Sequence, residues 1–296
     1  MNKINSKKNK LIIGTAQFGS KYGITNKNFT NQNESNQILN FCFKNNIREI
    51  DTAISYKGSE KILGNIGVKK FILSTKLPKI PNDKRIIKKW IHQELENSFN
   101  RLKLSSIDIL YLHNPADLSS KNKFLIYEIL QDLKASKLIK SIGVSVYSPQ
   151  ELMRILDQFQ IDAVQFPFNV MDTRFANKKV LSRLQDRSIK IYLRSIFLQG
   201  LLITPQSKHP KYFYKWSNYF KEWEIWLKEQ NISPIEGCLS HAISMFEDSK
   251  IIIGVSSLAN LKEIIKALDK EVPAVLKEIQ SKDLKLIDPR NWRNSA

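Results

Sequence analysis

Four polar side chains stand where apolar segments end, and together they form a set that can protonate a carbonyl oxygen. Asp51, Lys76 and His113 each close a short β-branched run, and Tyr56 lies in the loop after Asp51. A phenol has an ordinary pKa of about 10, and a nearby ammonium group favours the phenolate. A buried lysine keeps its charge when a carboxylate faces it. We therefore expect Lys76, held charged by Asp51, to lower the pKa of Tyr56.

The same set indicates a class of reaction. A proton donor beside an imidazole that orients a carbonyl suits reduction of an aldehyde or ketone by an external hydride source. No H-x-x-H spacing or carboxylate cluster suggests a metal. Each residue also has an ordinary alternative role: Asp51 as a turn former, Tyr56 in packing and Lys76 as a solvated strand end. The hypothesis rests on the succession of the four at consecutive strand ends.

Eight short β-branched runs recur along the chain, and each is followed by a longer amphipathic segment. Several runs are nearly continuous in apolar residues, which is typical of parallel strands covered on both faces. The expected strands are Leu11–Ile13, Glu49–Thr52, Phe71–Lys76, Ile107–His113, Ser141–Val146, Ala163–Phe168, Lys190–Ser195 and Ile251–Val255.

The segments between the runs carry helix start signals. Ser148 and Ser233 each precede a proline, and each has a glutamate three residues later. Eight alternations without a linker predict a single (β/α)8 TIM barrel over residues 1–296, with a basic, mobile tail at 1–10 and a C-terminal segment, 271–296, packed on the barrel. A doubly wound sheet is the alternative, but no strand is followed by a G-x-G-x-x-G turn.

The interval after the seventh expected strand is the longest, and we expect it to hold a helical insertion. Two helices, Phe213–Gln230 and Pro234–Phe246, are predicted there. Aromatic residues alternate with lysines in the first helix, and their three- and four-residue spacing predicts a buried face, although a few rings could reach substrate. The residues at this spacing are Phe213, Trp216, Phe220, Trp223 and Leu227.

The charge balance raises the question of a polyanionic partner. The 296 residues include 47 Lys and Arg against 28 Asp and Glu, a formal charge of +19. The basic clusters are scattered over the tail and several helices, and such runs are usually solvated faces. We therefore expect a small-molecule carbonyl substrate, with no nucleic-acid or membrane partner, and a steering role for the charge. The oligomeric state is left open.

Cysteine use and hydropathy indicate the compartment. Cys42 and Cys238 cannot form a disulfide framework and show no metal-ligand spacing. No apolar run approaches the roughly 18 residues of a membrane-spanning helix, and the N-terminus lacks a signal-peptide pattern. A cytoplasmic protein in a reducing compartment is expected.

The segment around Tyr56 carries a specific motif. Residues 51–64 read DTAISYKGSEKILG, which resembles the D-T-A-x-x-Y-x-x-S-E-x-x-L-G signature of the aldo/keto reductases. The resemblance extends from Ile12 to Leu268. Further matches follow in order at Ser74–Lys76, Ile107–His113, Ile142–Ser145 and Val164–Gln165.

The resemblance implies an activity and the roles of the four residues. It implies a barrel that binds NADPH, or less often NADH, and reduces an aldehyde or ketone without a metal. Tyr56 would be the general acid, Lys76 and Asp51 would tune it, and His113 would position the carbonyl.

The resemblance also implies a set of cofactor-binding residues. Ser145 and Gln165 would hold the nicotinamide carboxamide, whereas Val146 replaces the usual asparagine. Arg194 stands at the position of a tyrosine that stacks on the nicotinamide, and a guanidinium can also stack on a planar ring. The other positions implied after the seventh strand and at the eighth are Ser195, Phe197, Gln199, Gly254, Ser256, Ser257, Asn260 and Glu263.

The adenosine end departs from the family pattern. The cations that usually hold the 2′-phosphate are replaced by Ser256 and Asn260, with only Lys262 nearby. NADPH is the expected cofactor, and NADH is the alternative. The missing carboxamide contact at Val146 favours a second hypothesis, a dinucleotide-binding sensor or regulatory subunit with little turnover.

Two further segments resemble a bacterial branch of the family found beside genes for surface-polysaccharide or nucleotide-sugar synthesis. They are Thr15–Gly19 with Tyr22–Ile24, and Arg194–Gly200. This resemblance implies a sugar-like substrate. An arginine at the mouth of the site suits a substrate that bears a phosphate or a carboxylate.

Overall fold

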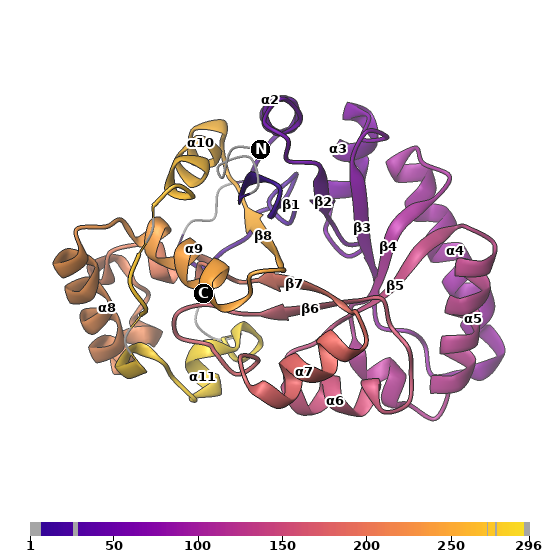
Figure 1. The fold of residues 1–296 in the computed structure, drawn as a ribbon. Coiled ribbons are helices and arrows are strands. Elements are labelled where there is room, and N and C mark those ends of the chain that lie inside the picture. The colour runs from indigo at the N-terminus through magenta and orange to yellow at the C-terminus, as the bar shows by residue number, and fades with distance from the viewer. Residues whose placement is uncertain (1–6, 26–28, 271, 276, 293–296) are drawn as a thin grey trace.

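Eight parallel strands close into a barrel in the order of the chain (Figure 1). The computed structural model describes residues 7–25, 29–270, 272–275 and 277–292. The closed order of parallel strands confirms the predicted TIM barrel. The strands are β1 (Leu11–Gly14), β2 (Glu49–Asp51), β3 (Ile72–Leu77), β4 (Ile107–Leu112), β5 (Ile139–Ser145), β6 (Ala163–Pro167), β7 (Lys190–Arg194) and β8 (Lys250–Gly254).

The register aligns the ends of neighbouring strands at one mouth of the barrel. Asp51 of β2 pairs with Ser74 of β3, and Ser145 of β5 pairs with Gln165 of β6. His113 follows the last paired residue of β4, and its backbone N–H donates to Leu77 O at 3.0 Å. Polar side chains that follow different strands in the sequence therefore meet at this mouth.

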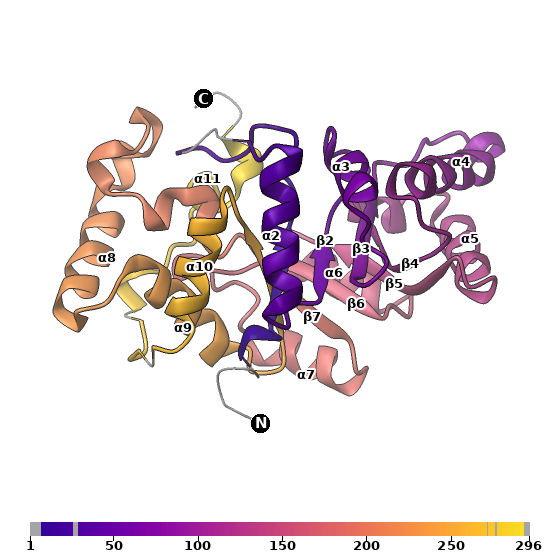
Figure 2. The same ribbon diagram turned by 90° about the horizontal axis from the view of Figure 1, so that it is seen from above.

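Helices surround the strands (Figures 1 and 2), and their start signals act as the sequence predicts. The Ser148 hydroxyl accepts from Glu151 N, and Ser233 forms a capping box with Glu236. The helices described are α2 (Gln32–Lys44), α3 (Ser59–Ile66), α4 (Lys84–Leu102), α5 (Lys123–Ala135), α6 (Pro149–Leu156), α7 (Lys178–Asp186), α8 (Ser217–Gln230), α9 (Pro234–Met245), α10 (Leu258–Ala267) and α11 (Leu284–Ile287).

The segment between β7 and β8 holds α8 and α9, preceded by three short 3-10 turns, Leu198–Ile203, Gln206–Lys208 and Lys211–Trp216. The first helix starts at Ser217 rather than at Phe213, because Trp216 leaves helical geometry with φ −110° and ψ 20°. The predicted aromatic stripe is buried and does not line the cavity described below. Its members are Phe213, Trp216, Phe220, Trp223 and Leu227.

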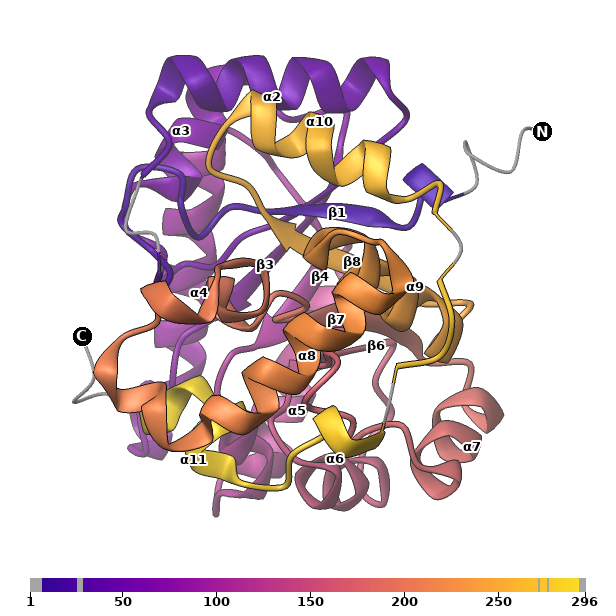
Figure 3. The same ribbon diagram turned by 90° about the vertical axis from the view of Figure 1, so that its left-hand side faces the viewer.

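The C-terminal segment packs beside α8, where Figure 3 shows α11. Trp216 Nε1 donates to Asp283 Oδ2 at 2.9 Å, and the rings of Phe213 and Trp292 lie edge to face with centroids 5.0 Å apart. Ser281 N donates to a carbonyl in the loop after β6 at 2.9 Å. These contacts hold the last part of the chain near the mouth of the barrel.

The described part of the basic N-terminal segment contacts the barrel. Lys7 Nζ donates to Leu268 O at 3.0 Å, and Lys250 Nζ donates to Asn9 O at 2.6 Å. Residues 1–6 of the predicted tail lie outside the described residues. None of the helices described is long and apolar enough to cross a membrane.

The barrel interior forms a packed floor under the mouth. The Tyr111 and Tyr192 rings meet edge to face with centroids 6.0 Å apart, and Lys76 Nζ lies 5.9 Å from the Tyr111 ring. Gly143 of β5 leaves room for Tyr111, because a Cβ atom there would lie 2.4 Å from the ring. The interior cluster comprises Ile12, Ile109, Tyr111, Ala163, Tyr192 and Ile252.

This close approach predicts a measurable loss of stability. Gly143→Ala should lower the free energy of unfolding by about 1–3 kcal/mol, because the added methyl overpacks the interior. The same change in a Tyr111→Leu background should cost less, because the ring is gone. Urea unfolding of the two single variants and the double variant tests this, and additive losses would contradict it.

Candidate active site

A buried ion pair forms the base of the site. Lys76 Nζ lies 2.5 Å from Asp51 Oδ2 and also donates to Thr52 O at 2.8 Å. Asp51 Oδ1 accepts from Ser74 Oγ and from Gln165 Nε2, both at 2.9 Å. Because both charges are almost fully buried, these additional hydrogen bonds offset part of their desolvation.

Tyr56 and His113 lie above this pair. Lys76 Nζ is 5.4 Å from the Tyr56 ring centroid, and the rings of Tyr56 and His113 are edge to face with centroids 6.1 Å apart. His113 Nδ1 is within 3.3 Å of Ser55 Oγ. The structure therefore brings together the four side chains singled out in the sequence.

The pKa of Tyr56 shifts in the direction opposite to the one expected. Burial raises it well above its ordinary value, and the negative charge of Asp51 raises it further. The expectation of a lowered pKa is therefore wrong for the structure described. Asp51 neutralises Lys76 at contact distance, so the pair presents little net positive charge to the phenol. Burial likewise lowers the pKa of Lys76, and Asp51 opposes that shift.

His113 is neutral at physiological pH. Burial lowers its pKa to about 4, and the positive charges of Lys76 and Arg194 contribute in the same direction. A neutral imidazole donates through one ring nitrogen only. With Nδ1 next to Ser55, Nε2 is the nitrogen available to a ligand.

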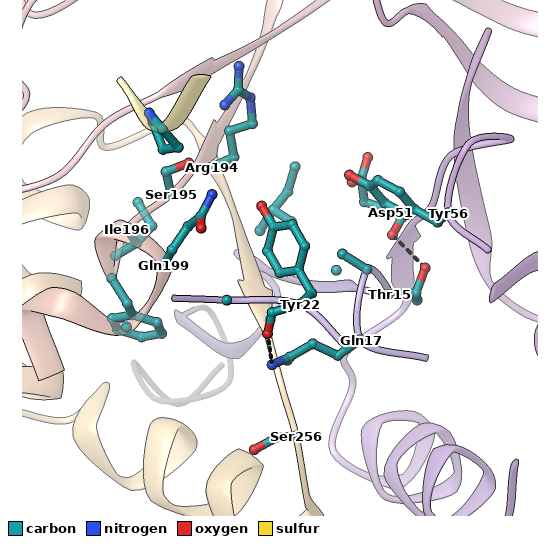
Figure 4. Close-up of a pocket in the computed structure, with 18 of the residues that line it drawn as sticks. Thr15, Gln17, Tyr22, Asp51, Tyr56, Arg194, Ser195, Ile196, Gln199 and Ser256 are labelled. Atoms are coloured by element: carbon teal, nitrogen blue, oxygen red, sulfur yellow. Dashed lines mark hydrogen bonds between the residues drawn. The ribbon is translucent and has the colours of Figure 1, made fainter. Parts of the chain in front are cut away.

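These residues open into an elongated cavity of about 510 Å3, a usual size for a small-molecule site (Figure 4). Ser256 lies at the end of it away from Tyr56 and Arg194 (Figure 4). The cavity therefore joins the mouth of the barrel to the start of α10. The predicted site residues that line it are Asp51, Tyr56, His113, Ser145, Gln165, Arg194, Ser195, Phe197, Gln199, Gly254, Ser256 and Asn260.

Three predicted residues lie elsewhere. Lys76 is beneath the cavity, and its ammonium group points to Asp51. Ser257 is the N-cap of α10, where its hydroxyl accepts from Asn260 N at 3.1 Å. Glu263 is exposed on α10. Val146, at the position of the usual asparagine, is fully buried and does not line the cavity.

Sequence reasoning did not assign several of the lining residues to the site, among them Tyr22, Tyr147 and Arg290. Tyr22 comes from the loop after β1, and Figure 4 shows its ring between Gln199 and Tyr56. A tyrosine beside glycine in a strand-end loop was a signal for Tyr22. No sequence signal pointed to Arg290, because this residue lies far from every strand end in the sequence.

Arg194, Tyr147 and Arg290 form a stack at the wall of the cavity. The Arg194 and Arg290 guanidinium carbons lie 4.0 and 3.7 Å from the centroid of the Tyr147 ring. Both guanidinium groups therefore stack on the same ring. Arg290 is paired with Asp288 at 2.6 Å. Arg194 donates to Val146 O at 3.2 Å, and among the described residues it has no carboxylate partner.

The chain belongs to the aldo/keto reductase family, which it matches over residues 10–283. It is 23% identical over 290 residues to D-arabinose 1-dehydrogenase from Saccharomyces cerevisiae, covering 87% of this chain and 84% of that protein. It is 27% identical over 190 residues to the aldo-keto reductase YhdN from Bacillus subtilis. That match spans 58% of this chain and little more than half, 55%, of the relative.

Solved structures share the fold. Aldo-keto reductase AKR11C1 from Bacillus halodurans, in its holo form, superposes with a TM-score of 0.69 at 19% identity, covering 91% of this chain and 89% of that one. The glycerol dehydrogenase AKR11B4 from Gluconobacter oxydans gives a TM-score of 0.67 at 18% identity, covering 89% and 88%. This chain is thus an oxidoreductase of the aldo/keto reductase family.

Several groups in the cavity fit a nicotinamide dinucleotide. The Ser145 hydroxyl lines it, and Gln165 commits only its NH2 group to Asp51, leaving an amide oxygen for a carboxamide. Gly254 at the end of β8 has no side chain to block the cavity floor toward α10. The described residues contain no group of three or more His, Cys, Asp or Glu side chains that could hold a metal.

Two buried histidines predict a loss of stability in acid. Burial lowers the pKa of His113 and of His241 to about 4, so between that pH and 6.5 the unfolded chain binds more protons than the folded one. Stability is therefore complete above pH 6.5 and falls as the pH drops toward 4. From pH 7.5 to 5, each histidine should account for about 2 kcal/mol.

Urea unfolding of the wild type and of His113→Asn at both pH values measures the contribution of His113 to this loss of stability. The variant should lose about 2 kcal/mol less than the wild type on acidification. An identical acid-induced loss in both proteins would contradict the assigned pKa.

Proposed function

We propose that this protein reduces an aldehyde or ketone to the alcohol with a hydride from NADH or NADPH. The observation that carries the proposal is the convergence of Tyr56, His113 and the Lys76–Asp51 pair at one end of an elongated cavity. The protein names of three relatives support a small hydroxylated or dicarbonyl substrate: D-arabinose 1-dehydrogenase, glyoxal reductase from Bacillus subtilis and a glycerol dehydrogenase.

Tyr56, His113 and the Lys76–Asp51 pair have different roles in proton transfer. A dinucleotide in the cavity would supply the hydride for the carbonyl carbon. His113, neutral, donates a hydrogen bond that orients the carbonyl oxygen. Tyr56 transfers its phenolic proton to that oxygen as the negative charge develops, and solvent later returns the proton. The raised pKa of Tyr56 keeps the proton in place at neutral pH until the oxygen becomes basic.

Lys76 acts on the phenolate that this transfer leaves behind. Asp51 keeps the lysine protonated, and the ammonium group, 5.4 Å from the Tyr56 ring centroid, offsets the repulsion between Asp51 and the phenolate. In the cofactor site, Ser145 and Gln165 would hold the carboxamide. The loop after β7, with Ser195, Phe197 and Gln199, would hold the rest of the nicotinamide half.

Removing the phenol tests this assignment. Tyr56→Phe should lower kcat by at least about 100-fold, the usual contribution of general acid catalysis, with dinucleotide affinity within about threefold of the wild type. The decrease in absorbance of NADH or NADPH with a reactive aldehyde measures kcat. Tyr214→Phe, at an exposed ring, is the control.

The outcomes separate the two hypotheses. Undiminished turnover in Tyr56→Phe would exclude this tyrosine as the acid. Wild-type protein that binds a dinucleotide but turns over no member of a broad carbonyl panel would favour the sensor or regulatory role.

We further propose that the substrate carries a carboxylate or a phosphate. Arg194 lines the cavity without a carboxylate partner among the described residues, and its charge acts on Tyr56 and His113. An anionic substituent would compensate that charge, and a sugar-like hydroxylated chain would suit the polar wall around it. Arg290 also stacks on Tyr147, but its pairing with Asp288 leaves Arg194 as the main source of positive charge at this wall.

A matched pair of substrates tests this charge preference. With 4-oxobutanoate and butanal, which differ in a terminal carboxylate, the wild type should show at least about a tenfold higher kcat/KM for the anion. Arg194→Gln should raise the KM of the anion and bring the two values together. Equal kcat/KM values in the wild type would contradict an anionic substrate.

A further inference from the structure

The aromatic ring against which Arg194 rests has a second cationic neighbour, from the C-terminal segment. Arg290 belongs to the short 3-10 turn Pro289–Asn291, and its guanidinium carbon lies 3.7 Å from the centroid of the Tyr147 ring. The guanidinium carbon of Arg194 lies 4.0 Å from the same centroid. All three residues line the cavity. The wall of the site therefore contains a stack that joins β7, the loop after β5 and the C-terminal segment.

A buried carboxylate holds Arg290 in place. Arg290 Nε donates to Asp288 Oδ1 at 3.0 Å, and Nη2 donates to Oδ2 at 2.6 Å. The Asp288 side chain is 3% exposed, and its Oδ1 also accepts from the backbone N–H of Arg290 at 3.1 Å. A pairing through two nitrogens fixes the plane of a guanidinium group and compensates its charge. Arg290 thus presents a flat surface to Tyr147 and adds little free charge to the cavity.

A second pair with the same spacing shows which part of this arrangement is local. Arg85 Nη2 donates to Asp83 Oδ2 at 2.8 Å at the start of α4, but the Arg85 side chain is 88% exposed. The spacing of the two residues therefore accounts for the ion pair alone. The position of Arg290 on an aromatic ring at the cavity wall depends on how the C-terminal segment packs on the barrel.

The Tyr147 ring is a main support of the Arg194 guanidinium. Arg194 Nη2 donates to Val146 O at 3.2 Å, and its buried Nε has no hydrogen-bond partner among the described residues. One hydrogen bond does not fix the orientation of a long side chain, whereas stacking of the planar group on a ring adds a second constraint. The backbone of Tyr147 is held by Glu151, because Tyr147 N donates to Glu151 Oε2 at 3.1 Å. Its ring is held by the groups that pack against it.

We propose that Arg290 is a positioning residue for the anionic group of the substrate. By stacking on Tyr147 it holds the ring that supports Arg194, and it thereby keeps the charge of Arg194 at the cavity wall. This inference rests on the proposed preference for a carboxylate or a phosphate. The role requires the planar shape of the guanidinium group rather than its charge, because Asp288 already compensates that charge.

A substitution that keeps the charge and removes the planar group tests this role. Arg290→Lys can still pair with Asp288, but an ammonium group offers no flat surface to the ring. The KM for 4-oxobutanoate should rise by about three- to tenfold, because the anion meets a less ordered Arg194. The KM for butanal and both kcat values should stay within about twofold. Arg85→Lys, in the exposed pair of the same spacing, is the matched control.

A double-mutant cycle identifies the route through the ring. Tyr147→Leu removes the ring and should raise the KM for 4-oxobutanoate by a similar factor. The two substitutions together should exceed the larger single effect by less than about twofold, because both act through the same stack. Independent effects, which would multiply, would overturn the proposed route through Tyr147.

The remaining outcomes separate this inference from the proposed function. An unchanged KM for 4-oxobutanoate in Arg290→Lys, or an equal rise in the KM for butanal, would overturn the inference while the charge preference of the wild type stands. Equal kcat/KM values for the two substrates in the wild type would overturn the proposed charge preference, and the inference with it.

Discussion

The buried contact between Lys76 and Asp51 is the constraint on which the site depends. Two charges that are almost fully removed from water are tolerated only when their remaining donors and acceptors are satisfied. Here the partners come from three strands: Thr52 after β2, Ser74 on β3 and Gln165 on β6. The hydrogen bond from Gln165 reaches Asp51 across the barrel mouth, so the pair also requires the barrel to be closed in the observed register.

The same pair determines how charge is distributed in the cavity. Because Asp51 neutralises Lys76, burial dominates the environment of Tyr56 and the phenol retains its proton. Among the described residues, Arg194 on β7 lines the cavity without a carboxylate partner, whereas Arg290 is paired with Asp288. The protein as a whole has a formal charge of +19. The overall charge can steer anions toward the protein, but these local groups select among them.

The sequence by itself determined the eight strands and the residues at their ends. Continuous apolar runs bounded by polar residues are typical of parallel strands, and consecutive strand ends are neighbours in a barrel. Asp51, Lys76 and His113 could therefore be placed together from order alone. The start of the helix after Ser233 was equally predictable, because a capping box is a local contact. The start of α8 was not predicted: the backbone departs from helical geometry at Trp216, whose indole contacts Asp283, a residue distant in the sequence.

Only the tertiary structure decided the rest of the site. Arg290 reaches the Tyr147 ring from the C-terminal segment, and both residues line the cavity. Such contacts depend on how the helices pack around the barrel, and no spacing in the sequence encodes them. The direction of the Tyr56 pKa shift was hidden for the same reason. Residue types identify which charges are present, but burial and the distances between the charges decide which of them shift the pKa of the phenol.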